Sequence, residues 1–199
     1  MISWDLFILH QINLEWTHPL MDWLMPAVSA INAWLPLLLL VLLLVLWHGG
    51  KKGRLLILCL ALALGVSDGI ISHSLKKMVG RVRPRDSLEN VMIRDLGKGS
   101  PEFMRLFSAP TQRMSAPKGD LRGSSFPSSH VMNLFAAATT VALFYRRSGA
   151  ALYFLALLVA YSRIYVGAHW PSDVVPSIGM GILVGWGVTR LLQRQLAVI

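Results

Sequence analysis

Five apolar runs, separated by loops that carry most of the charge, constrain the fold of this chain more than any other feature. A helix of about twenty apolar residues is long enough to cross the hydrocarbon core of a bilayer. The runs predict five membrane-spanning helices, at 30–47, 55–74, 128–145, 150–166 and 172–192. With 54% hydrophobic and 15% charged residues, the chain is predicted to form one all-α integral membrane domain over 1–199.

The first 29 residues follow a different pattern. Aromatic and aliphatic side chains alternate there with Asp5, His10 and Asn13, as in short helices that lie at a membrane interface. We therefore expect residues 1–29 to form interfacial helices that precede the first span.

Short basic loops predict the orientation of the spans, because positive residues concentrate in cytoplasmic loops. Three clusters fall on one side: Lys51, Lys52 and Arg54, then Arg146 and Arg147, then Arg190 and Arg194. The longer segment 85–126 is also basic, but long loops cross membranes with little regard to charge. We predict it to be an exoplasmic loop of a bacterial inner membrane protein, facing the periplasm or exterior.

The formal net charge of +9 raises the question of a polyanionic partner. The basic residues lie in loops beside apolar spans, so they favour the bilayer and a phosphorylated membrane lipid as partners, and no nucleic acid. Cys59 is the only cysteine and lies inside an apolar run. This excludes a disulfide framework and a thiolate metal cluster.

Three short motifs carry the chemistry, and all three fall at the predicted exoplasmic ends of the spans. They are Lys76 to Arg83-Pro84, then Pro127-Ser128-Ser129-His130, then Ser162-Arg163 with His169 and Asp173. Together they supply three fixed cations, two histidines, hydroxyls and a carboxylate. Such a set can hold a phosphate while one histidine attacks the phosphorus and another protonates the leaving oxygen.

In the first motif, Lys76 and Arg83 would lie almost two helical turns apart, on one face and about 10 Å from each other. Arg83 offers a planar fork to two phosphate oxygens, and Lys76 a point charge. Gly80 and Pro84 indicate that the helix ends in this region.

The second and third motifs place polar groups at helix ends. Pro127 is a good first-turn residue, Ser128 or Ser129 can cap, and a phosphate docks readily at such a helix start. Pro171 predicts the start of the fifth span. Asp173 then falls in its first turn, from which it can reach His169. Arg163, near the end of the fourth span, is costly there without a partner or a watery pocket.

The combined pattern resembles the type 2 phosphatidic acid phosphatase superfamily: Lys-x6-Arg-Pro, Pro-Ser-x-His, and Ser-Arg-x5-His-x3-Asp. Ser129 stands where that family usually has glycine. The resemblance implies a helical bundle in which His169 is the nucleophile forming a phosphohistidine, His130 the general acid and Asp173 the residue that orients His169. It also implies phosphate binding by Lys76, Arg83, Ser128, the backbone at Ser129, and Arg163. Vanadium haloperoxidases share the architecture, but five spans favour a lipid phosphatase.

A zinc site built from His130, His169 and Asp173 is a rival hypothesis. The nearby cations Lys76, Arg83 and Arg163 would repel a divalent ion, so we expect neither a metal nor another cofactor. Asp68, inside the second span, is expected to have a partner, with Arg163, Lys76 and His73 as candidates.

The expected activity is hydrolysis of a phosphate or diphosphate from a lipid at the exoplasmic face. Undecaprenyl diphosphate is favoured as substrate, and phosphatidylglycerol phosphate, phosphatidic acid and lipid A phosphates are alternatives. A lipid phosphotransferase, and a non-catalytic lipid-binding protein or flippase, also fit the motifs.

Overall fold

The computed structural model describes residues 3–117 and 123–196, most of which are helical. By length and composition, four helical stretches could cross a membrane: α3 (Ile31–His48), Gly50–Ser87, α8 (Arg146–Tyr165) and α9 (Pro171–Leu196). A fifth apolar helix, α7 (Ser129–Phe144), has 16 residues. These elements match the five predicted spans in order, and the all-helical membrane class is confirmed.

The second span is longer than predicted. It runs without a break through α4 (Gly50–Leu64), the π-helical segment η2 (Gly65–Ser72) and α5 (His73–Val79). It ends at Gly80, which takes a left-handed conformation with φ of 60° that glycine adopts without strain. Asp68 is exposed on η2 and forms no salt bridge with a described residue, so none of its three expected partners pairs with it.

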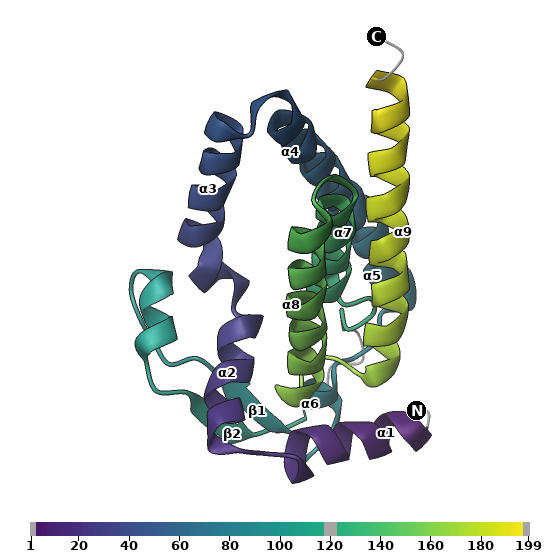
Figure 1. Cartoon of the computed structure of the whole chain (residues 1–199). Coiled ribbons are helices and arrows are strands. Elements are labelled where there is room, and N and C mark those ends of the chain that lie inside the picture. The colour runs from purple at the N-terminus through teal and green to yellow at the C-terminus, as the bar shows by residue number, and fades with distance from the viewer. Residues whose placement is uncertain (1–2, 118–122, 197–199) are drawn as a thin grey trace.

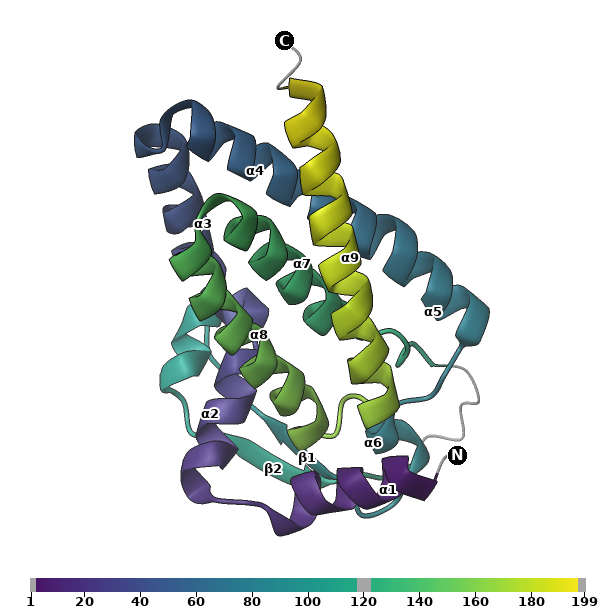
Figure 2. The ribbon, with the colours of Figure 1, turned by 45° about the vertical axis from the view of Figure 1, so that its right-hand side comes forward.

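Helix α7 lies at the centre of the bundle and packs against α4, α8 and α9 (Figures 1 and 2). Two glycines of α9 allow the closest approach. A Cβ atom on Gly181 would come within 2.4 Å of the Met132 carbonyl oxygen, and one on Gly185 within 2.4 Å of the Ala136 carbonyl oxygen. This spacing of small residues is typical of tightly packed membrane helices.

The N-terminal helices cover one end of the bundle. They are α1 (Ser3–His10), η1 (Gln11–Glu15) and α2 (Pro19–Ser29), and α1 lies across the end of the bundle in Figure 1. Asn13 ties them to the bundle, because its amide donates to the carbonyl oxygens of Met92 at 2.8 Å and Tyr165 at 2.7 Å.

The predicted exoplasmic loop contains structure that its sequence did not reveal. After α6 (Pro84–Ser87), β1 (Met92–Asp95) pairs antiparallel with β2 (Thr111–Met114), and the 3-10 helix η3 (Glu102–Phe107) lies between the strands. Residues 118–122 of the loop, like residues 1–2 of the N-terminal segment, lie outside the described part of the chain. In η3, Phe107 is 83% exposed, so this segment presents apolar surface.

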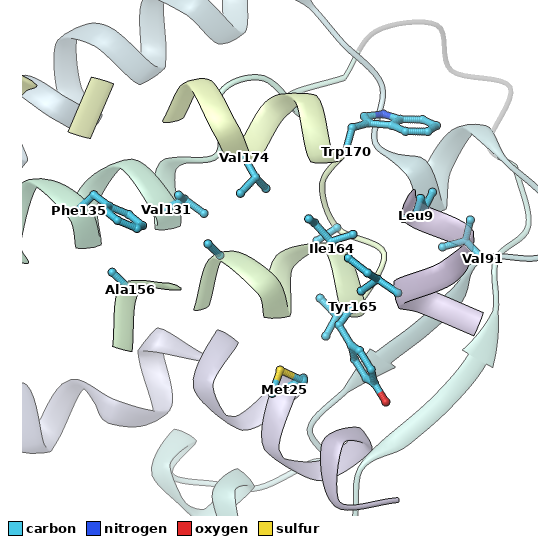
Figure 3. Close-up of a cluster of buried hydrophobic side chains, with 14 residues drawn as sticks. Leu9, Met25, Val91, Val131, Phe135, Ala156, Ile164, Tyr165, Trp170 and Val174 are labelled. Atoms are coloured by element: carbon cyan, nitrogen blue, oxygen red, sulfur yellow. The ribbon is translucent and has the colours of Figure 1, made fainter. Parts of the chain in front are cut away.

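A hydrophobic cluster fixes the ends of the helices that carry the motifs (Figure 3). It joins Val131 of α7, Ile164 and Tyr165 of α8, and Val174 of α9, with Trp170 in the connection between α8 and α9. Such close packing holds the second and third motifs in a fixed relation. The three basic loop clusters lie at the opposite end of the bundle, where α3 meets α4, α7 meets α8, and α9 ends (Figure 1).

Candidate active site

The three motifs meet at the end of the bundle that the N-terminal helices cover. His130, in the first turn of α7, lies within electrostatic range of the cations Lys76, Arg83 and Arg163 and of the His169 ring. Residues from four separate elements and loops therefore surround one position. The structure brings together all of the predicted phosphate-binding and catalytic residues.

Lys76 and Arg83 do not share a helix face, which corrects the geometry expected from their spacing. Helix α5 ends at Val79, and Arg83 is extended at the start of α6 (φ −73°, ψ 153°). The left-handed turn at Gly80 ends the helix, so Arg83 reaches the site from the segment that follows it.

The two serines of the second motif have different roles from the capping role expected. Ser128 precedes α7 as its N-cap residue, but its hydroxyl makes no capping hydrogen bond. Its backbone N–H donates to the hydroxyl of Ser177 at 2.9 Å. The Ser129 hydroxyl accepts from the ammonium of Lys76 and lies 2.6 Å from the Ser72 hydroxyl. A side chain in place of the usual glycine thus positions the Lys76 cation.

Three predicted phosphate ligands have a buried polar atom without a hydrogen-bond partner among the described residues. These atoms are Nε of Arg83, Oγ of Ser128 and Nε of Arg163. Buried polar groups ordinarily have partners. Guanidinium N–H groups and a hydroxyl are donors that suit the oxygens of a phosphate.

His169 is held with one ring nitrogen free. It is 2% exposed, and its Nδ1 lies 2.7 Å from the carbonyl oxygen of Ser125. A carbonyl can only accept, so Nδ1 carries the proton and Nε2 keeps its lone pair. Burial lowers the pKa of His169 to about 4; Asp173 opposes this shift, while the positive charges of Arg163 and Arg83 add to it. The imidazole is therefore neutral at pH 7.

Asp173 lies in the first turn of α9, which begins at Pro171 as predicted. Its carboxylate is 3.8 Å from Nδ1 of His169, too far for a hydrogen bond. The direct bond expected from the sequence is replaced by a path through Ser125, whose hydroxyl donates to Asp173 and whose carbonyl accepts from His169.

Sequence reasoning missed the residues that hold Asp173. Arg81 donates through Nη1 to Asp173 at 2.6 Å and through Nη2 to Asp5 at 2.7 Å. Asp5, fully buried, also accepts from the backbone N–H of Ser172 at 2.9 Å. Arg81 looked like one more member of a basic run, and no local pattern links it to an N-terminal helix.

A second arginine at this end of the bundle also contacts a carboxylate. Arg94, on β1, is 4% exposed, and its Nε lies 2.6 Å from Asp22 of α2. Its Nη1 donates to the carbonyl oxygen of Asn13 at 2.8 Å, and its guanidinium lies 4.5 Å from the centre of the Tyr165 ring. Arg94 joins the hairpin to the N-terminal helices.

A cavity of about 320 Å³ opens beside the start of α7. His130 and Arg163 line it, and Arg163 donates to the Ser29 hydroxyl at 2.6 Å. The rest of the lining is mixed. Its polar side chains include Asn32, Arg85, Arg94, Asp95 and Arg105, and its apolar residues include Ile31, Leu96 and Val166. The cavity therefore has room and hydrogen-bonding groups for more than one phosphate.

Within residues 3–117 and 123–196, no three histidine, cysteine, aspartate or glutamate side chains are grouped so that they could hold a metal ion. The positive groups available to bind an anion near His130 are the side chains of Lys76, Arg83 and Arg163. The arrangement suits transfer of a phosphoryl group balanced by side-chain cations.

Comparison with known proteins gives concordant findings. Residues 54–197 match the family model of the PAP2 superfamily. The chain is 27% identical over 171 residues to a lipid A 4'-phosphatase of Bacteroides thetaiotaomicron, covering 84% of this chain and 68% of that protein. It is 38% identical over 60 residues to a putative undecaprenyl-diphosphatase of Escherichia coli, covering 30% of each.

The fold also matches a solved structure. The crystal structure of Aquifex aeolicus LpxE superposes with a TM-score of 0.67 at 26% sequence identity. The match covers 95% of this chain and 96% of that one.

Proposed function

The chain belongs to the PAP2 superfamily and is a membrane lipid phosphatase, and from this premise we propose that His169 is its nucleophile and His130 its general acid. The observation that carries the proposal is the tautomer of His169. Its Nδ1–H is held by the Ser125 carbonyl, which leaves the Nε2 lone pair free beside the convergent cations.

In the first step, Nε2 of His169 forms a bond to phosphorus while the bond from phosphorus to the leaving oxygen of the lipid breaks. His130 gives its proton to that oxygen, a contribution typically worth about 10²–10⁴-fold in rate. Arg83, Arg163 and Ser128 hold the remaining oxygens through their Nε and Oγ atoms, which have no partner among the described residues. Lys76 adds a positive charge from the side of Ser129.

In the second step, water attacks the phosphorus of the phosphohistidine and the N–P bond breaks. His130, now neutral, takes a proton from that water, so the products are inorganic phosphate and the original enzyme. Asp173 and Ser125 keep the His169 ring in place throughout. In this mechanism, positive side chains do the work that a metal ion does in other phosphatases.

The site is proposed to face the periplasm or exterior from a bacterial inner membrane. One feature supports this orientation. The three basic loop clusters lie together at the opposite end of the bundle, where the positive-inside rule places the cytoplasm.

Two lipid classes have separate support as substrates. Phosphorylated glycolipids of the lipid A class lead, because the match to a lipid A 4'-phosphatase extends over most of the chain. The cavity lining adds to this, since Asn32 and Asp95 can hydrogen-bond sugar hydroxyls. Undecaprenyl diphosphate is the second class, supported by the higher identity of a shorter segment.

Phosphate release by purified protein tests the activity. We expect lipid A to be hydrolysed with the highest kcat/KM, undecaprenyl diphosphate next, and phosphatidylglycerol phosphate and phosphatidic acid less well. Activity should survive EDTA and be blocked by vanadate. His169→Ala should abolish release, and His10→Ala, which removes an exposed histidine at the same end, should not.

Each other outcome has a clear meaning. Release by His169→Ala at the wild-type rate contradicts the nucleophile assignment, and activity restored by a divalent ion after EDTA contradicts the metal-free mechanism. Transfer of the phosphoryl group to a second lipid instead of water would identify a phosphotransferase. Tight lipid binding without any release would identify a lipid-binding protein or flippase.

A further inference from the structure

A second cavity, of about 250 Å³, lies on the lipid-facing side of the bundle between α3 and the pair α7 and α8. Its lining is apolar and includes Ile31, Trp34 and Leu38 of α3, Leu134 of α7, and Leu155 and Val159 of α8. We call it the apolar groove.

The position of α3 explains the groove. Only 6% of the residues of α3 are buried inside the protein. The helix packs mainly against α4 and η3, and it stands apart from α8 in Figure 1. Trp34 is nevertheless fixed, because its indole N–H donates to the carbonyl oxygen of Ala27 at 2.8 Å. The ring therefore contributes a firm apolar wall near the start of α3.

The apolar groove joins the catalytic cavity. Ile31 lines both. On α7, Leu134 of the groove follows His130 of the cavity by one helical turn. On α8, Val159 of the groove precedes Arg163 of the cavity by one turn. Moving from the phosphate position along either helix toward the middle of the membrane thus leads directly into the groove.

We propose that the apolar groove holds the part of the substrate's hydrocarbon tail nearest the headgroup, while the rest of the tail stays in the bilayer. This inference rests on the proposed lipid phosphatase function and assigns its tail site. When the phosphate of a lipid lies between His130 and Arg163, its hydrocarbon tail must extend out of the cavity along an apolar path. The groove supplies such a path, because it begins one helical turn from both residues. Substrate then enters sideways from the membrane between α3 and α8.

The test compares two leucines of α8 that are two residues apart. Leu155 lines the groove, whereas Leu157 is not among the groove residues; both face lipid, being 39% and 54% exposed. Leu155→Trp should reduce kcat/KM for dioleoyl phosphatidic acid roughly tenfold relative to dibutyryl phosphatidic acid, because the larger ring fills the groove. Leu157→Trp should leave the ratio of the two substrates unchanged. Leu38→Trp on α3 should repeat the effect of Leu155→Trp.

Equal loss of both substrates in Leu155→Trp, or the same change in Leu157→Trp, would overturn the tail site. A binding measurement separates this from failure of the proposed activity. Phosphatidic acid with a diazirine in its acyl chain, photolysed with His169→Ala protein in vesicles, should label α3 and α8 at groove residues. Leu155→Trp should remove that labelling, whether or not the wild type releases phosphate. Labelling confined to other lipid-facing positions would contradict the proposal.

Discussion

Two pairs of arginines at the same end of the bundle behave in opposite ways. Arg81 and Arg94 each contact a carboxylate, at 2.6–2.7 Å, and are held by further hydrogen bonds. Arg83 and Arg163 form no salt bridge with any carboxylate in the described part of the chain. The Nε atoms of Arg83, Arg163 and Arg94 all lack a hydrogen bond to a described residue, but only that of Arg94 lies beside a carboxylate, Asp22. Residue type and burial alone do not separate the two pairs.

The different pairing of the two sets of arginines shows how the protein can fold with a strongly positive site. A buried guanidinium without a counter-ion is costly, and in the proposed mechanism the substrate phosphate supplies the counter-ion for Arg83 and Arg163. The first pair instead ties together segments far apart in the sequence. Arg81 joins α1 to α9, and Arg94 joins β1 to α2. We therefore expect Arg83 and Arg163 to serve catalysis, and Arg81 and Arg94 to serve the framework.

The largest expected effect is on turnover in Arg163→Ala. Removing a positioned donor from a site of developing negative charge typically costs about 10²–10³-fold in rate. We expect a loss at the upper end of that range in kcat/KM for lipid substrate, with the melting temperature in detergent at or above the wild-type value. A lowered melting temperature together with full activity would place Arg163 in the framework pair.

Arg94→Gln should lower the stability of the protein and leave its turnover nearly unchanged. Removing one partner of a buried ion pair costs about 3–5 kcal/mol, and Asp22 would be left without its cation. Denaturant or thermal unfolding should show this loss, while the protein that remains folded should turn over lipid within about twofold of wild type. The double variant Arg94→Gln, Asp22→Asn should recover part of the stability. If Arg94→Gln unfolds like the wild type, the framework assignment fails.

Arg81→Gln is expected to lie between these extremes, because Arg81 contacts both a framework carboxylate, Asp5, and a site carboxylate, Asp173. Asp173 would lose a charged hydrogen bond, and its control of the His169 ring through Ser125 would loosen. We expect kcat to fall by roughly tenfold with KM little changed. Arg81→Lys, which keeps the charge, should restore part of kcat; equal loss in both variants would indicate a purely structural role.

The smallest effect concerns pH. His169 attacks only when neutral, and burial lowers its pKa to about 4. The acid limb of kcat/KM assigned to His169 should therefore lie near pH 4, well below the usual histidine value of about 6.5. The same shift makes the unfolded state bind more protons between these values, so stability should fall as pH drops from about 6.5 to 4. An acid limb near 6.5 would mean that the His169 ring is not held as described.

The sequence was sufficient to predict the order of the apolar helices, and its three motifs contain residues that the structure brings to one end of the bundle. Apolar length sets the spans, and the cost of a charge such as Arg163 at a helix end marks the site. Local pattern also placed Pro171 and Asp173 correctly at the start of α9.

The contacts that orient these residues could not be predicted in the same way. Ser125 and Arg81 reach Asp173 across 48 and 92 positions of sequence. Every residue has a backbone carbonyl, so the sequence does not indicate that the carbonyl of Ser125 is the one that accepts from His169. The spacing of Lys76 and Arg83 was misleading because a left-handed turn at Gly80 interrupts the helix. The β1–β2 hairpin was missed because its strands are only four residues long.

Direct trapping of the covalent intermediate tests the central claim. Wild-type protein turning over ³²P-labelled lipid phosphate should be quenched in alkali, which preserves phosphohistidine, and digested with trypsin. Cleavage after Arg163 and Arg190 gives a peptide, 164–190, whose single histidine is His169, whereas His130 is the single histidine of peptide 123–146. The mechanism predicts acid-labile label on peptide 164–190. Label on peptide 123–146, or steady turnover with neither peptide labelled, would contradict it.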